Sequence, residues 1–451
     1  MLVPPFLPPS AMTTTRNGQN LTSAMENISR GIREGVAHLR TENERLEGRT
    51  IQVQGRELVH FGSCSYLGLE MDTRLKVASA EAIGRYGTQF SSSRTFMELG
   101  LYEEYEALLS RMFGAPALVT PTTTLGHLAA VPLVVKDSDA VIMDHQAHAS
   151  LGMAIQLLRA RGVHIELIRH SRLDMLENRL NKLQNKYRKI WYFGDGVYSM
   201  YGDLAPLPGL MRLLEAYDNL WLYMDDAHGI SWTGPYGSGY VNSWLSGHPR
   251  VIMTASLNKS FAAGGGAIIF PNQEMKQEVR TLGSTLIFGG PLQPAMLGAG
   301  MASARVHLSP ELPVMQAELQ QRLKWMRHYA TEMGVPLYPN LSSPIAFVEV
   351  GAHEGGFQLM HRLMEAGYFV NLSVFPSVPR LRTGMRLTLT RHLQQADIVG
   401  VLAVIAEALP QILKAGGTSV EAVQAEFAKD QTPAPEPVAP AEAVLAIPDA
   451  A

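Results

Sequence analysis

The sequence predicts an α/β fold: a large domain with a mostly parallel central sheet, followed by a smaller α+β domain. Two observations predict it. Short apolar runs rich in Val, Ile, Leu and aromatic residues recur between residues 117 and 270, and such runs are typical of strands buried on both faces. Stretches of helical periodicity separate several of them. Strands that alternate with helices favour a parallel sheet covered on both sides.

Seven apolar runs are expected to form the strands of this sheet. They are ALVT (117–120), AVIMD (140–144), VHIELI (163–168), KIWYFG (189–194), LWLYMD (220–225), VIMT (251–254) and AIIF (267–270). The stretches SRLDMLENRLNKLQNKY and LPGLMRLLEAY carry the helical pattern between strands.

The pattern of expected strands and helices changes near residue 308. A long helical stretch, ELPVMQAELQQRLKWMRHYATEMG, is followed by SPIAFVEV, a further helix and RLTLT. We therefore expect a leader with an N-terminal helical segment (1–50), a large domain (51–307), a small domain (308–415) and a disordered Ala/Pro-rich tail (416–451). The opening MLVPPFLPPS lacks a basic region and is interrupted by prolines, so it predicts a flexible leader rather than a signal peptide; a start at Met12 is left open.

Composition excludes several classes of protein. Of 451 residues, 46% are apolar and 18% charged, which is typical of a folded chain. A net charge of -3 gives no electrostatic reason to bind nucleic acid or an anionic membrane. The sequence has no run of about 18 consecutive apolar residues, so it predicts no membrane span. The single cysteine, Cys64, excludes an intrachain disulfide and favours a reducing compartment such as the cytoplasm.

Six polar side chains follow the expected strands at one kind of place, at or just past the carboxyl end. They are His148, Ser199, Asp225, His228, Ser256 and Lys259. In an open parallel sheet, ligands bind in the crevice beyond the carboxyl ends of the strands. This shared position predicts a binding site at that edge of the sheet.

Each residue taken singly also has an ordinary interpretation. Serines are common in turns, and Asp225-Asp226 is compatible with an acidic turn that caps a helix. On a strand, however, neighbouring side chains point to opposite faces, so one aspartate can face the site while the other faces away. Thr123 and Thr124 fit a simple helix start, but free N–H groups at a helix start also hold phosphate. Together these residues predict a phosphorylated carbonyl cofactor.

The same residues carry a resemblance to a known family. DDAHGISWTGPYGSGY (225–240) is similar to its Asp-Glu-Ala-His segment with spaced glycines, and GVYSMYGDLAPLP (196–208) to its Phe-Ser-Met-Asp-Gly-Asp segment. DHQAHAS, SLNK, SYLGL, SSSR, SPI and RLTLT keep the family's order. From about residue 50 to about residue 410 the chain resembles the α-oxoamine synthases, which are fold type I enzymes that use pyridoxal 5'-phosphate (PLP).

The resemblance implies a role for each matched position. Lys259 would form the Schiff base with PLP and move protons at the substrate Cα. Asp225 would pair with the pyridine nitrogen and keep the ring an electron sink. His148 would stack over the ring and act as acid or base. The other matched residues are His228 with Ser199 at the phenolic oxygen, Thr123, Thr124 and Ser256 at the phosphate, and Arg386 at the amino-acid carboxylate.

The implied reaction joins an amino acid to an acyl thioester of coenzyme A or a carrier protein, with loss of CO2, to give an α-amino ketone. The family's sites lie in homodimers, so a homodimer is implied. Two alternatives stay open: another PLP reaction on the same fold, such as amino transfer or aldol cleavage, and a non-catalytic partner subunit. Such subunits lack the Schiff-base lysine, whereas this chain has Lys259.

The chain also departs from the family pattern. Cys64 replaces an asparagine that helps to place the substrate, and it fits either a substrate contact or a small buried apolar residue. Thr122-Thr123-Thr124 replaces Ser-Gly-aromatic, His127 replaces an asparagine and Tyr102 a histidine. Gly289-Gly290 replaces hydroxyl residues that contact the partner's phosphate. These changes indicate a divergent synthase.

Overall fold

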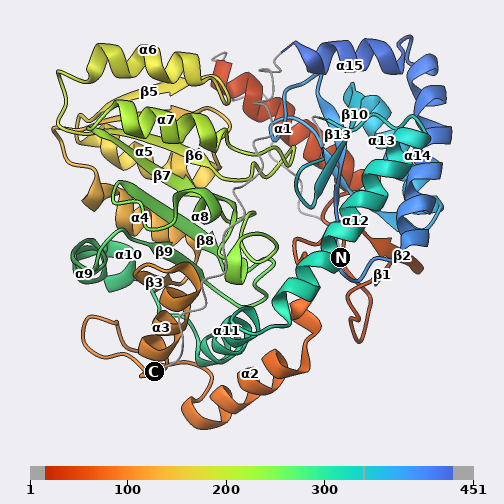
Figure 1. Ribbon diagram of the computed structural model, residues 1–451. Coiled ribbons are helices and arrows are strands. Elements are labelled where there is room, and N and C mark those ends of the chain that lie inside the picture. Colours follow the sequence, from red (N-terminus) through yellow and green to blue (C-terminus); the bar gives the residue numbers. More distant parts are fainter. Residues whose placement is uncertain (1–15, 339–340, 430–451) are drawn as a thin grey trace. The chain divides into compact units, whose positions relative to one another are not determined.

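The computed structural model describes residues 16–338 and 341–429, which form two compact units (Figure 1). The larger unit comprises residues 64–321 and 342–344, and the described remainder forms the smaller unit. The boundaries differ from those expected at 51 and 308. Residues 51–63 group with the C-terminal segments, whereas residues 308–321 group with the larger unit.

The larger unit is built on a seven-stranded sheet. Its strands, in spatial order, are β3 (Ala117–Thr120), β9 (Gly266–Ile269), β8 (Val251–Ser256), β7 (Leu220–Asp225), β6 (Ile190–Asp195), β4 (Ala140–Asp144) and β5 (His164–Ile168). The five strands from β8 to β5 are parallel, and β9 is antiparallel to both of its neighbours. The expected mostly parallel sheet is confirmed.

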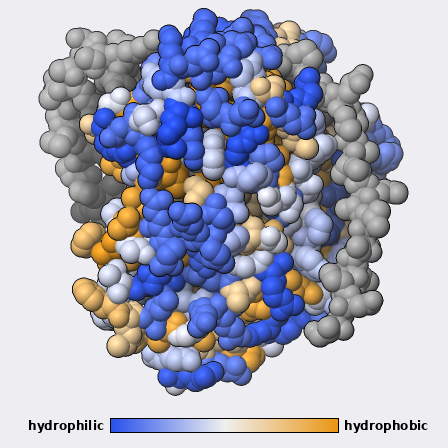
Figure 2. Space-filling view, turned by 60° about the vertical axis from the view of Figure 1, so that its left-hand side comes forward, coloured by the Kyte–Doolittle hydropathy of each residue, from blue (hydrophilic) through white to orange (hydrophobic). Residues whose placement is uncertain are grey.

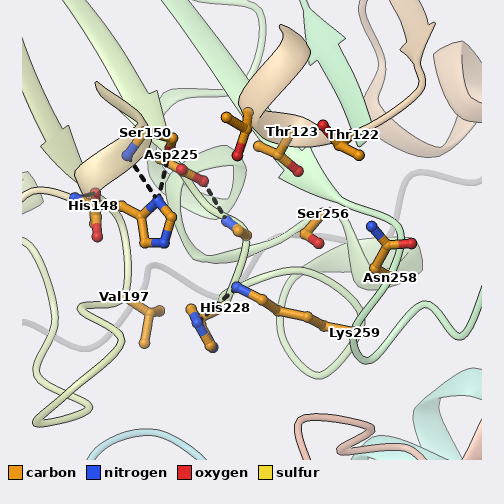
Figure 3. A pocket seen from close by; sticks show the side chains of 13 residues that line it. Thr122, Thr123, His148, Ser150, Val197, Asp225, His228, Ser256, Asn258 and Lys259 are labelled. Atoms are coloured by element: carbon orange, nitrogen blue, oxygen red, sulfur yellow. Dashed lines mark hydrogen bonds between the residues drawn. The ribbon is translucent and has the colours of Figure 1, made fainter. Parts of the chain in front are cut away.

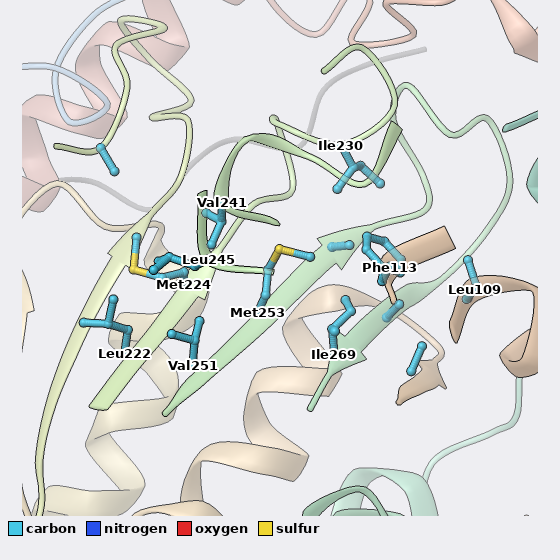
Figure 4. Close-up of a cluster of buried hydrophobic side chains, with 14 of the residues drawn as sticks. Leu109, Phe113, Leu222, Met224, Ile230, Val241, Leu245, Val251, Met253 and Ile269 are labelled. Atoms are coloured by element: carbon cyan, nitrogen blue, oxygen red, sulfur yellow. The ribbon is translucent and has the colours of Figure 1, made fainter. Parts of the chain in front are cut away.

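Apolar side chains cover both faces of this sheet. On β6, Trp191 belongs to one buried cluster and Tyr192 to another, because successive side chains of a strand point to opposite faces. The first cluster includes helices α4 (Thr123–Val134), α5 (Ala149–Ala160), α9 (Gln273–Leu282) and α10 (Ser284–Ile287). The second includes α3 (Leu101–Phe113), α6 (Leu173–Leu183), α7 (Leu207–Ala216), α8 (Tyr240–Leu245) and α11 (Pro294–His307). Figure 4 shows part of the second cluster, where Met224 and Met253 lie on neighbouring strands.

The parallel strands bring their carboxyl ends to one edge of the sheet. Asp195 at the end of β6 lies opposite Asp225 at the end of β7, and Asp225 lies opposite Thr254 of β8. The chain leaves each strand at this edge and enters a loop or helix. Polar residues at strand ends therefore meet here, although the sequence separates them by tens of residues.

The smaller unit contains two three-stranded sheets. One has the order β1 (Thr50–Val53), β2 (Arg56–His60), β11 (Tyr368–Phe369), and the other β10 (Ile345–Gly351), β13 (Thr383–Thr388), β12 (Asn371–Ser373). The pairing of β2 with β11 explains why residues 51–63 group with the C-terminal segments. Its helices are α1 (Arg16–Arg33), α13 (His353–Glu365), α14 (Gln395–Ala415) and α15 (Val420–Ala428), and α12 (Leu312–Glu332) contributes residues to both units.

The tail prediction is wrong where the structure describes the chain. Residues 420–428 form α15, whose start is capped by Ser419: its hydroxyl oxygen accepts a hydrogen bond from the Ala422 N–H. Val423 and Phe427 are buried, and the Phe427 ring packs against Phe347 of β10. These apolar contacts hold a segment that the prediction had assigned to the tail. The leader at 1–15 and the remaining tail at 430–451 lie outside the described residues.

Among the described helices, α14 is long and apolar enough to cross a membrane by length and composition. One face of this helix, including Ile398 and Leu402, is buried in the structure. Near its start, Asp397 accepts hydrogen bonds from Arg49 at 2.6 and 2.9 Å. A buried core helix passes the same test, so α14 does not overturn the expectation that the chain has no membrane span.

Candidate active site

A cavity of about 210 Å³ opens at the carboxyl edge of the large sheet (Figure 3). Its lining comes from the ends of β6, β7 and β8, the starts of α4 and α5, and the loops beside them. The lining residues are Thr122, Thr123, Thr124, His148, Ser150, Asp195, Val197, Asp225, Ala227, His228, Ser256, Asn258 and Lys259. The structure thus brings together most of the site residues that the sequence predicts.

Lys259 lies in the connection between β8 and β9. Its Nζ is 2.7 Å from His228 Nε2 (Figure 3). His228 Nδ1 is 2.7 Å from the Tyr66 hydroxyl. The connection is closed by Asn258, whose side-chain oxygen accepts from the Gly265 N–H at 3.1 Å. Gly265 has φ +97°, and a Cβ there would lie 2.7 Å from the Thr120 carbonyl, so only glycine fits this turn. The tight turn therefore fixes the backbone position of Lys259.

Asp225 is a buried carboxylate with two donors. Its Oδ1 accepts from the Ala227 N–H at 3.0 Å, and its Oδ2 lies 3.0 Å from His127 Nε2. Burial alone would raise the pKa of Asp225, but the hydrogen bond and field of His127, with the charge of Lys259, hold that pKa well below its ordinary value. Asp225 therefore faces the cavity as an anion.

Asp226 faces away from the cavity, as the alternation of side chains predicts for one member of the pair. It is fully buried, and its Oδ2 accepts from the Val241 N–H at 2.9 Å. Gly229 and Gly239 pack closely against this carboxyl group. An added Cβ would lie 2.0 Å from Oδ1 at Gly229 and 2.3 Å from Oδ2 at Gly239. Burial raises the pKa of Asp226 to about 7. Asp226 thus packs inside the turn that follows β7, on the side away from the cavity.

Asp195 is a cavity residue that the sequence reasoning missed. It ends β6 opposite Asp225, and its Oδ1 accepts from the His148 N–H at 3.0 Å. Burial, and then the charge of Asp225, raise the pKa of Asp195 well above its ordinary value. The available signal was its place at the end of the apolar run IWYFGD, one strand before the run that ends in Asp225.

His148 caps the start of α5. Its Nδ1 accepts from the Ser150 N–H at 3.3 Å and lies 2.7 Å from the Ser150 hydroxyl (Figure 3). A backbone N–H can only donate, so Nδ1 carries no proton and the geometry assigns the proton to Nε2. Burial also lowers the pKa of His148. His148 is therefore a neutral imidazole with one donor, at Nε2, at neutral pH.

The start of α4 forms a further wall of the cavity. Thr122 caps this helix, since its hydroxyl oxygen accepts from the Leu125 N–H at 3.1 Å, and the Thr123 hydroxyl donates to the Ala255 carbonyl at 3.2 Å. Gly266 of β9 lets the helix start come close, because a Cβ there would lie 2.5 Å from the Thr123 nitrogen. A helix N-terminus beside hydroxyl groups of Thr124 and other residues suits an anionic group such as phosphate.

Three of the expected site residues are not among the cavity lining. Ser199 lies in the segment after β6, from which Val197 contributes instead. Cys64 is half-buried at the first residue of the larger unit. Arg386 belongs to the smaller unit, where it is buried on β13 opposite Phe347 of β10. The roles of these three residues stay predictions.

Comparison with known proteins identifies the family. Residues 56–399 match the family model described as aminotransferase class I and II. The chain is 30% identical over 378 residues to the 8-amino-7-oxononanoate synthase of Dechloromonas aromatica, covering 83% of this chain and 95% of that protein. It is 31% identical over 367 residues to that of Geobacter sulfurreducens, covering 80% and 91%.

Solved structures show the same fold. The serine palmitoyltransferase from S. paucimobilis superposes with a TM-score of 0.79 at 22% identity, covering 87% of this chain and 98% of that one. An 8-amino-7-oxononanoate synthase from Francisella tularensis gives 0.63 at 19% identity, covering 78% and 97%. The chain therefore belongs to the α-oxoamine synthase family of fold type I PLP-dependent enzymes, within aminotransferase class I and II.

Proposed function

We propose that this chain is a PLP-dependent acyltransferase that joins an amino acid to an acyl thioester, with loss of CO2, to give an α-amino ketone. The relatives named as 8-amino-7-oxononanoate synthases support this reaction class. The observation that carries the proposal is one cavity lined by Lys259, Asp225, His148 and His228. These residue types at this edge of the sheet are those that the cofactor's chemistry needs.

The cavity residues fit PLP at both of its ends. The anionic Asp225 suits a protonated ring nitrogen, and the hydroxyl groups of Thr124 and Ser256, with the backbone at Thr123 where α4 starts, suit the phosphate. The close approach of Gly266 to Thr123 keeps this wall free of a side chain. When bound, PLP supplies an electron sink that stabilises negative charge at the amino acid's α-carbon.

The chain's own groups hold and move protons around that carbon. Lys259 supplies the amine that binds the cofactor covalently and then carries the proton. His228 lies within hydrogen-bond distance of this amine, and Tyr66 holds the other nitrogen of His228, so the imidazole has a fixed orientation. His148, neutral with its proton on Nε2, can donate a hydrogen bond to oxygen on which negative charge develops.

Three further roles belong to the proposal. Arg386 has the planar guanidinium that binds a carboxylate in a bidentate way, and we assign to it the carboxylate of the amino acid. Cys64 stands where the family has an asparagine that helps to place the substrate, so we assign it to amino-acid selection. Ser199 would support the phenolic oxygen with His228. For each residue, the support is the matched motif in the sequence.

We also propose a homodimer in the cytoplasm. The side chains of Phe96 and Phe288 are 86% and 87% exposed, and their two segments adjoin, because the Ser93 hydroxyl donates to the Ile287 carbonyl at 2.7 Å. Figure 2 shows hydrophobic residues exposed in places on a largely hydrophilic surface. Exposed apolar patches favour association with a partner. A single cysteine, Cys64, supports a reducing compartment.

The homodimer is tested by light scattering after size exclusion. The purified chain should have the mass of two copies. The double variant Phe96→Asp/Phe288→Asp should shift towards one copy, since it places charge in the apolar patch. A wild-type chain with the mass of a single copy at micromolar concentration would contradict the proposal.

The enzyme proposal is tested by absorbance and by thiol release. The purified protein with added PLP should show a visible band that Lys259→Ala loses, and one amino acid should shift that band. With this amino acid, a panel of acyl-CoA and acyl-carrier-protein thioesters should release free thiol. A protein that takes up no PLP would contradict the proposal, as would amino transfer to a keto acid without thiol release from any donor.

A further inference from the structure

His127 connects two residues of the larger unit that the sequence separates widely. Its Nε2 lies 3.0 Å from Asp225 Oδ2, across 98 residues of sequence, and its Nδ1 lies 3.1 Å from the Tyr223 hydroxyl, across 96 residues. The imidazole has no exposed surface and is absent from the cavity lining. His127 therefore acts on the cavity only through Asp225.

The direction of these hydrogen bonds follows from the groups involved. An ionised carboxylate can only accept, so Nε2 of His127 donates to Asp225. The Tyr223 hydroxyl occupies the other nitrogen, and the two rings pack with centroids 5.6 Å apart. With both nitrogens bound, the imidazole has one orientation in which Nε2–H meets the carboxylate.

Asp225 needs such a donor because burial alone would raise its pKa. Asp195 faces it from β6 and Asp226 follows it in sequence, and burial and the charge of Asp225 raise the pKa of both. Lys259 after β8 favours the charge, and His148 at the start of α5 favours it only when that imidazole is protonated. Lys259 is also the amine assigned to the cofactor and substrate, and His148 is neutral at neutral pH. Of these groups, His127 is the donor that hydrogen-bonds the carboxylate and takes no other part in the site.

We propose that His127 is a positioning residue, which holds the Asp225 carboxylate ionised and oriented for the cationic ring nitrogen of PLP. The identity of the ligand, PLP, rests on the proposed function. The contact between His127 and Asp225 is independent of that proposal. The sequence alone marked His127 only as a departure from the family pattern.

The test compares His127→Gln with His127→Met, two variants of nearly equal size. Glutamine keeps an N–H donor near the position of Nε2, whereas methionine has none, so their difference isolates the hydrogen bond. Circular dichroism checks that both variants fold. PLP affinity is measured from the absorbance of the bound cofactor between pH 6 and pH 8.5.

We expect His127→Gln to bind PLP within about threefold of wild type, and His127→Met to bind at least about tenfold more weakly at pH 6, the size of one charge-assisted hydrogen bond. The gap should narrow towards pH 8.5, because Asp225 regains its charge without the donor. A purely structural role for His127 predicts an equal loss in both variants, or a gap that does not change with pH. Either result would overturn the proposal.

Thermal melting without PLP separates this inference from the proposed function. At pH 8 the Gln variant should melt about 2 °C or more above the Met variant. The gap should close as the pH falls towards 5, since Asp225 of the Met variant then takes up a proton and needs no donor. A wild-type protein that binds no PLP would sink the proposed function but leave this melt as a test of the contact. A melting gap that is absent at every pH would overturn the inference.

Tyr223→Phe provides a second route to the answer if His127→Met does not fold. It keeps His127 but removes the hydroxyl group that holds Nδ1. PLP binding should weaken by about threefold at pH 6 and less at pH 8.5, because the donor loses its fixed orientation. Binding equal to wild type at both pH values, in a folded variant, would count against the proposal.

Discussion

Asp225 and Asp226 are neighbours at the end of β7, yet the two sides of the sheet edge give them opposite properties. On the cavity side, Asp225 accepts from His127 and from the Ala227 N–H, with Lys259 nearby, and its pKa lies well below the ordinary value. On the core side, burial raises the pKa of Asp226 to about 7. The comparison shows that donors and burial, rather than residue type, decide which carboxyl group is charged.

The core side offers few donors to Asp226. The Val241 N–H reaches Oδ2 at 2.9 Å, but within the described part of the chain Oδ1 has no hydrogen-bond partner. Glycines at 229 and 239 surround the carboxyl group instead of polar side chains. A charge here would be buried and poorly compensated, so the neutral form is favoured below about pH 7.

The largest expected difference between the two aspartates is in kcat/KM, when each is replaced by asparagine. Asp225→Asn should lower kcat/KM by about 10²–10³-fold, because it removes a charge that faces the cavity. Asp226→Asn should change it less than about tenfold, because the group is neutral over much of the pH range and lies outside the cavity. Steady-state kinetics with the same substrates measure both. Equal losses in two folded variants would mean that the two sides do not differ in this way.

The pH dependence of stability should sharpen the comparison. The pKa of Asp226 is raised on folding, so between about pH 4 and pH 7 the unfolded chain has released a proton that the folded chain keeps. The free energy of unfolding should therefore fall as the pH rises from about 4 to about 7, and Asp226 should contribute a few kcal/mol to that fall. Denaturant unfolding of wild type and Asp226→Asn at several pH values measures it.

The difference between wild type and Asp226→Asn removes the contribution of Glu349, whose pKa is also raised to about 7 by burial. The variant should have the flatter profile. Parallel profiles for the two proteins would show that Asp226 is charged in the folded state across the range.

The glycine packing behind Asp226 predicts a smaller loss of stability. Gly229→Ala places a Cβ 2.0 Å from Asp226 Oδ1, so the turn must shift, and we expect a loss of about 1–3 kcal/mol. Gly152→Ala in α5 is the matched control. Nothing lies within 4 Å of its added Cβ, and alanine should stabilise the helix by up to about 1 kcal/mol. Thermal melts of both variants test this, and an unaffected Gly229→Ala protein would contradict the close packing.

The smallest effect should come from Asp195→Asn on the cavity side. Burial and the charge of Asp225 favour a protonated Asp195, and an amide resembles that neutral acid in shape. The amide oxygen can still accept from the His148 N–H. PLP affinity should therefore change less than about threefold, well below one hydrogen bond to a charged group. A loss as large as that of Asp225→Asn would show that Asp195 also carries charge.

The strands of the large sheet could be predicted from the sequence because their signal is local. Each expected run agrees with an observed strand to within two residues at either end, from 117–120 for β3 to 251–254 for β8. The helix α15 was not predicted, although VEAVQAEFA is rich in helix-forming residues and follows the cap residue Ser419. Burial of Val423 and Phe427 against β10 stabilises it, and that contact depends on residues far away in sequence.

The site residues also divide into those that the sequence predicts and those that it does not. Lys259, Asp225 and His148 stand out in the sequence, since each follows an apolar run in a motif that resembles one family. Asp195 did not stand out, because its role depends on β6 lying beside β7 and in register with it. The hydrogen bond from His127 to Asp225 was equally hidden, since nothing local relates the two positions.

The sequence by itself determined the fold class, the family and the residues at the ends of the strands. Apolar periodicity acts over a few residues, and motif order survives without coordinates. Only the tertiary structure decided which acid is charged. Ionisation depends on burial, donors and neighbouring charges within a few ångströms, and at Asp225 these come from α4, the turn at Ala227 and the connection after β8.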